Sequence, residues 1–176
     1  MAHPFVLRRK LATVAVLAAL MFSAKAAHAD GLVCVSVDED TRIDVYLAPA
    51  SPTDHATKIV SRLEISDPNR TPAHRLIATF DVADGVLATN GGDVLATVDL
   101  SKAGSSRAGQ RVGGTRLGSL KSILLDIDIS YEEPIDQGTR YAAEVTYAKK
   151  NGEKLHQDFD CSYFPNQSPN TVSIKP

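Results

Sequence analysis

Hydrophobic and polar residues alternate with a period of two along most of the chain after residue 30. Because successive side chains of a strand point to opposite faces of a sheet, this period predicts β-strands. Nine segments carry the alternation or a short apolar run: 32–37, 42–48, 57–65, 75–82, 86–89, 93–100, 120–131, 139–148 and 154–163. No segment in this part of the sequence keeps a helical period beyond two turns.

Turn-forming residues separate these segments: Asp38-Glu39-Asp40, Asp67-Pro68-Asn69, Asp84-Gly85, Asn90-Gly91-Gly92 and Asn151-Gly152. Short strands joined mostly by short turns are typical of antiparallel sheets. We therefore expect an all-β, single-domain antiparallel β-barrel or β-sandwich of eight to nine strands. The pattern does not distinguish the barrel from the sandwich.

One set of alternate residues in each segment is apolar and is expected to face the core. The clearest sets are Ile43, Val45 and Leu47; Leu76, Ala78, Phe80 and Val82; Val94, Ala96, Val98 and Leu100; and Ile123, Leu125, Ile127 and Ile129.

The last two segments also predict how they pair. Every second residue from Tyr141 to Tyr147 is apolar or aromatic, so these residues form one face of a strand. Leu155, Phe159 and Cys161 form a matching face on the next segment. A two-residue Asn151-Gly152 turn would put an apolar residue opposite an acidic one. A three-residue loop over 150–152, with glycine in the left-handed region as a bulge, brings the two apolar faces together. We therefore predict the three-residue loop, with Cys161 on the core face opposite Tyr141.

The N-terminus has the features of a secretory signal peptide. Arg8, Arg9 and Lys10 precede an apolar run over 11–22, and Ala27-His28-Ala29 fits an A-x-A cleavage site. The run is shorter than the roughly 18–20 residues that a membrane helix needs. We expect a cleaved signal peptide at 1–29, a β-domain at 30–164 and a flexible tail at 165–176. The product would be soluble and periplasmic or extracellular, without a membrane span.

The chain has two cysteines, Cys34 and Cys161, which in an exported protein most simply form one disulfide. No C-x-x-C motif indicates redox or metal chemistry. Cys34 alternates with Leu32 and Ser36, whereas the opposite face of the same segment carries valines at 33, 35 and 37. If Cys34 faces the core, these valines must be covered elsewhere or a bulge must intervene.

Removing residues 1–29 removes four cationic and no acidic side chains, so the domain keeps 15 Lys and Arg against 21 Asp and Glu. Its net charge of −6 makes nucleic acid and anionic membranes poor partners for the domain as a whole.

Acidic residues gather on the expected outer face of the last strands: Asp126, Asp128, Glu144, Asp158 and Asp160. The predicted register puts Glu144 opposite Asp158, and opposed like charges are destabilising. A cation such as Ca²⁺ or a basic partner would relieve them. In the alternative interpretation the face is simply solvated, and Arg140, Lys154 and His156 dilute the repulsion. The sequence favours this alternative because it has no calcium-loop spacing, so we predict no metal or cofactor.

Residues 101–121 carry five cations and no acidic side chain, together with five glycines: the cations are Lys102, Arg107, Arg111, Arg116 and Lys121. Such a loop could bind a phosphate, a sulfate or a carboxylate polymer. The segment has no P-loop spacing, and a flexible loop is the simpler interpretation.

The sequence lacks a G-x-S-x-G motif, and the histidines His55, His74 and His156 are scattered. We therefore expect a non-catalytic exported β-domain that binds a macromolecular partner, as an envelope or extracellular interaction or inhibitor-type protein. The alternative is a closed-barrel carrier of a small apolar ligand. A small hydrolase is the third possibility.

Overall fold

Nine strands pair into one antiparallel sheet in the computed structural model, which describes residues 30–51, 53–81, 86–87, 94–101, 109–127, 137–167, 169 and 172. The strands are β1 (Asp30–Ser36), β2 (Arg42–Ser51), β3 (Asp54–Ser66), β4 (Leu76–Asp81), β5 (Val86–Leu87), β6 (Val94–Asp99), β9 (Leu120–Ile127), β10 (Arg140–Lys149) and β11 (Lys154–Phe164). Each of them overlaps one of the nine predicted segments, with ends that differ by a few residues.

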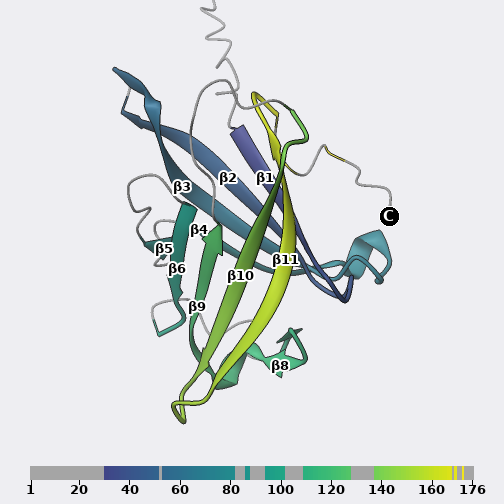
Figure 1. Ribbon diagram of the computed structural model, residues 1–176. Coiled ribbons are helices and arrows are strands. Elements are labelled where there is room, and N and C mark those ends of the chain that lie inside the picture. Colours follow the sequence, from purple (N-terminus) through teal and green to yellow (C-terminus); the bar gives the residue numbers. More distant parts are fainter. Residues whose placement is uncertain are drawn as a thin grey trace, which may run out of the picture.

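The strand order is β4-β3-β2-β1-β11-β10-β9-β6-β5, so the first and last strands of the domain are hydrogen-bonded neighbours. The strands curve around a common interior (Figure 1), and β5 also lies next to β3. The sheet is therefore a nearly closed antiparallel barrel, which confirms the predicted fold class. The described residues contain no α-helix; 3₁₀ turns occur at η1 (Pro72–His74) and η3 (Leu117–Ser119).

The interior is made of the alternate apolar residues that the sequence pattern indicates. Ile43, Val45, Leu47 and their counterparts on β6 and β9 are buried in one continuous core. Leu76 is an exception, because it is 51% exposed while its neighbour Ile77 is buried. A register shift between Ile65 and Ser66, where β3 pairs with β4, reverses the orientation of Leu76. Val82 and Ile129 lie outside the described residues.

The β10–β11 hairpin has the predicted register. Tyr147 pairs with Leu155, and Cys161 lies opposite Tyr141 on the core side. The amide of Lys149 donates to the carbonyl of Glu153, and Gly152 has a φ of +90°. These features confirm the three-residue loop with glycine in the left-handed region.

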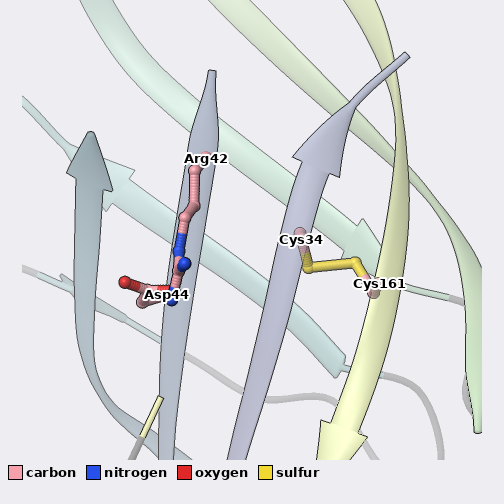
Figure 2. Close-up of a disulfide and its surroundings, with 4 residues drawn as sticks. All are labelled: Cys34, Arg42, Asp44 and Cys161. Carbon is pink, nitrogen blue, oxygen red and sulfur yellow. A yellow bond between two sulfur atoms is a disulfide. The ribbon is translucent and has the colours of Figure 1, made fainter. Parts of the chain in front are cut away.

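Cys34 and Cys161 form the predicted disulfide and are directly opposed on β1 and β11 (Figure 2). Both cysteines are fully buried in the barrel interior. The bond joins residues 127 positions apart and thereby links the two ends of the domain.

The valines of β1 lie on the outer face, where Val33 is nevertheless fully buried. The C-terminal segment packs on this face: Pro169 lies against Gly31, and one guanidinium nitrogen of Arg42 donates to the carbonyls of Pro169 and Val172. The backbone amide of Asn166 donates to Asp30. Val33 is therefore covered from outside the barrel, and no bulge is needed to bury it.

Part of the long loop expected at 101–121 is regular structure, so that expectation is wrong for residues 109–121. β7 (Arg111–Val112) and β8 (Thr115–Arg116) form a hairpin, followed by η3 and the start of β9. Gly113 and Gly114 make its turn with φ values of +50° and +71°. Strands of two residues are too short to show an alternating pattern, which is why the sequence did not predict them.

Candidate functional site

Four carboxylates form a group on the outer face of β9, β10 and β11, which we call the acidic strip: Asp126, Glu144, Asp158 and Asp160. Glu144 is paired with Asp126 on one side and with Asp158 on the other. Adjacent strands are about 4.8 Å apart, so the three carboxylates form a row across the sheet. Asp160 lies two residues further along β11, on the same face. All four are exposed, and the predicted fifth member, Asp128, lies outside the described residues.

Glu144 is the member of the strip with a hydrogen-bonded basic neighbour. Its Oε1 lies 2.9 Å from Nδ1 of His156 and accepts a hydrogen bond from Thr146 at 3.3 Å. The hydrogen bond from His156 lowers the pKa of Glu144. Asp126, Asp158 and Asp160 have no ion-pair partner among the described residues.

The two cations expected to dilute the strip are not paired with it. Arg140 lies opposite Ser162, and Lys154 lies opposite Ala148, two rows of the sheet away from Asp158. Apolar side chains border the strip instead. Val37 is 67% exposed, and its amide donates to the carbonyl of Asp158. The strip is therefore a negatively charged surface with a small apolar margin.

A metal site at the strip has no support in the geometry. Within the part of the chain that the structure describes, no group of three or more His, Cys, Asp or Glu side chains is placed to hold a metal ion. The row of carboxylates extends across the outer face of three neighbouring strands, whereas Ca²⁺ needs six to eight oxygen ligands converging on one point.

His156, Thr146 and Glu144 bring together the residue types of a catalytic triad, but not its geometry. The Thr146 hydroxyl and the Glu144 carboxylate both lie beside the same ring nitrogen, Nδ1 of His156. A triad needs the nucleophile and the carboxylate on opposite nitrogens of the ring. His74 is exposed in η1, and His55 has no described side chain. The contacts of His156 therefore do not form a triad.

The described cations of the predicted basic loop lie at one end of the barrel. Arg111 and Arg116 are directly opposed on β7 and β8, and both are exposed. Lys121 is exposed on β9, next to the register shift at Ala148 and Lys149. Lys102 and Arg107 lie outside the described residues.

A second charged group on β2 and β3 was not predicted from the sequence. Arg42 donates to Asp44 at 2.8 Å (Figure 2), and Arg62 donates to Glu64. Tyr46 also donates to Glu64, and the Arg62 guanidinium lies 5.3 Å from the centre of the Tyr46 ring. On each of these strands a basic and an acidic side chain lie two residues apart and face outward. This spacing in the sequence could have indicated the group.

Burial dominates the titration of this second group. It raises the pKa of Asp44, although Arg42 acts in the opposite direction. Burial, with help from Glu64, raises the pKa of Tyr46 to about 12. Because its carboxylates already have cationic partners, the group has the character of a structural network and not of a free binding surface.

A chain of polar side chains crosses the end of the barrel beside the β7–β8 hairpin. The hydroxyl of Tyr147 donates to Gln157, whose amide donates to Asp40. The same oxygen of Asp40 also accepts from Ser36 and Thr41. These hydrogen bonds connect residues of β1, β10 and β11 with Asp40 and Thr41, and burial raises the pKa of Tyr147.

Comparison with known proteins does not assign the chain to a family. No protein-family model matches it, and neither a curated protein nor a solved structure gives a match. Among the described residues, no helix has the length and apolar character required to cross a bilayer.

Proposed function

We propose that this protein is a non-catalytic, exported binding domain that takes a cationic macromolecular partner on the acidic strip. The observation that carries the proposal is the row formed by Asp126, Glu144 and Asp158, in which, as far as the structure describes the chain, only Glu144 has an ion-paired basic neighbour. Directly opposed like charges destabilise a sheet by a few tenths of a kcal/mol or more. Lysine and arginine side chains of a partner would remove that repulsion on binding.

The surroundings of the strip favour a protein partner over a small cation. The carboxylates are spread over three strands, so they match several separate cationic groups better than one ion. Val37 and Ala142 are exposed beside them and offer apolar contact. Charge complementarity of this kind mainly raises the association rate and makes binding sensitive to salt.

The carrier alternative has less support. A ligand cavity of about 300 Å³ or more would leave accessible surface on the side chains that line it. On the inner face, Leu32, Val45, Val98, Ile127 and Val145 have none. Among the described residues, the centre of the barrel is therefore occupied by the protein's own side chains.

The disulfide supports export as the setting for this function. A disulfide persists in oxidising compartments, and the Cys34–Cys161 bond connects the first and last strands. The secretory features of the N-terminal sequence agree with this setting. On this basis we infer that the protein acts in the periplasm or the extracellular space.

Affinity capture with the mature protein tests the proposal. The wild type would be compared with Glu144→Gln/Asp158→Asn and with a control double variant, Asp38→Asn/Glu39→Gln, which removes the same charge from exposed positions outside the strip. Basic proteins that elute with added NaCl should be retained by the wild type and the control and lost by the strip variant. Retention of the same proteins by all three forms would refute the role of the strip.

A further inference from the structure

We propose that Arg111 and Arg116 form a binding site for a tetrahedral oxyanion, the phosphate or sulfate group of a ligand. The two residues are a directly opposed pair on β7 and β8. Opposed side chains on an antiparallel pair have Cβ atoms about 5 Å apart. Two guanidinium groups at that separation can donate to the same anion, and the planar fork of arginine suits its oxygens.

The hairpin that carries the pair is held firmly on the barrel. Val112 and Leu117 are buried in the core, and the amide of Leu117 donates to the carbonyl of Gln110. Gly113 packs so closely on Tyr147 that a Cβ atom there would lie 2.9 Å from the ring. The amide and the ammonium of Lys150 donate to the carbonyls of Ser119 and Gly118. The arginines therefore extend from a fixed platform, and binding would not have to order a loop.

The charges of the pair are not neutralised by the described part of the protein. Arg42, Arg62 and Arg70 each have a carboxylate partner, whereas Arg111 and Arg116 have none. One guanidinium nitrogen of Arg111 donates to the carbonyl of Gly114 at 3.5 Å.

Asp40 is an acidic residue near the hairpin turn: it accepts a hydrogen bond from the side-chain amide of Gln157, which lies beside Gly113. One of its oxygens already accepts hydrogen bonds from Ser36, Thr41 and Gln157.

The opposed arginines repel each other as the opposed carboxylates of the acidic strip do, and an anion would remove that repulsion. The site is separate from the strip and does not depend on the proposed function.

Calorimetric titration of the mature protein with sodium phosphate, against sodium chloride at equal ionic strength, tests the site. We expect saturable phosphate binding that Arg111→Gln/Arg116→Gln weakens by about tenfold or more, since charge-assisted hydrogen bonds are lost. Arg75→Gln/Arg140→Gln is the matched control, because both residues are exposed and lie outside the hairpin. It should bind phosphate like the wild type.

Equal responses to phosphate and chloride, or unchanged phosphate binding by Arg111→Gln/Arg116→Gln, would overturn the proposal. Circular dichroism of each variant establishes that it is folded, and Arg116→Gln alone provides a milder substitution. Co-sedimentation with phosphatidylcholine vesicles, with and without phosphatidylglycerol, then identifies the source of the anion. Binding to the phosphatidylglycerol vesicles that requires both arginines indicates a lipid headgroup, and phosphate binding without vesicle binding indicates a soluble anion.

Discussion

Gly31 lies directly beneath Pro169, so that a Cβ atom at residue 31 would be 2.4 Å from Cγ of the proline ring. The contact places the C-terminal segment on the outer face of β1. Gly31→Ala should displace that segment and lower the free energy of unfolding by about 1–3 kcal/mol, as overpacking does elsewhere. Thermal unfolding and limited proteolysis of the C-terminus measure the two effects. Gly109→Ala is the control, because a Cβ atom there would meet nothing within 4 Å; equal behaviour of the two variants would contradict the packing.

Arg42 should stabilise the domain in a pH-dependent way. The side chains of Arg42 and Asp44 are 14% and 8% exposed, and burial raises the pKa of Asp44 despite the arginine. Arg42→Ala leaves a buried carboxylate without its cation, and we expect a loss of about 2–4 kcal/mol at neutral pH.

The sign of the pH dependence follows from Asp44. Without Arg42 its folded-state pKa rises further, so the folded state binds a proton more readily than the unfolded state. The loss should therefore shrink as the pH falls through the raised folded-state pKa towards the unfolded-state value of about 3.9, and should be smallest below about pH 3, where the carboxyl is protonated in both states. Urea unfolding at several pH values measures it. In Arg42→Ala/Asp44→Asn the pH dependence of the stability loss should vanish. If the stability loss of Arg42→Ala is instead constant with pH, the arginine acts only through its hydrogen bonds to the carbonyls of Pro169 and Val172.

The disulfide should contribute strongly to stability. Closing a loop of 127 residues stabilises a fold by up to about 5 kcal/mol in the chain-entropy model. Cys34→Ala/Cys161→Ala should lose a large part of this value in chemical denaturation. Since both cysteines are in the bond, a thiol reagent should find no free thiol in the denatured, non-reduced wild type. Since both cysteines are buried, dithiothreitol should reduce the bond only when denaturant is added. Two reactive thiols before reduction would contradict the bond.

The two glycines of the β7–β8 turn should respond differently to substitution by alanine. Both have a positive φ, which disfavours alanine by about 1–2 kcal/mol. Gly113 also contacts Tyr147, whereas a Cβ atom at Gly114 would meet nothing within 4 Å. Gly113→Ala should therefore be the more destabilising of the two in thermal unfolding. Equal losses would mean that the hairpin does not pack on Tyr147.

Neutralising one carboxylate of the acidic strip should stabilise the isolated domain. Asp158→Asn removes a charge opposed to Glu144, and we expect a gain of about 0.2–1 kcal/mol at low salt that fades as salt is added. Differential scanning calorimetry at two ionic strengths measures it. A melting temperature that rises with calcium in the wild type but not in this variant would favour a metal site instead.

The alternation of apolar residues was enough to predict the nine strands, the antiparallel class and the register of the β10–β11 hairpin. It sufficed because a slip of one residue would put the apolar faces of the two strands on opposite sides of the sheet, and the three-residue loop avoids that slip where the two-residue turn does not. The opposed positions of Glu144 and Asp158 followed from the same register. The disulfide followed from the cysteine count.

Tertiary structure decided the features that depend on contacts between distant segments. Burial of Val33 and Asp44 accompanies the return of the C-terminal segment over β1 and β2, and no local pattern of β1 or β2 encodes that contact. The orientation of Leu76 depends on a register shift where β3 meets β4, and the β7–β8 hairpin depends on the packing of Gly113 against Tyr147. Local periodicity records which face of a strand is apolar, but only the folded chain determines what lies against that face and which charges remain without a partner.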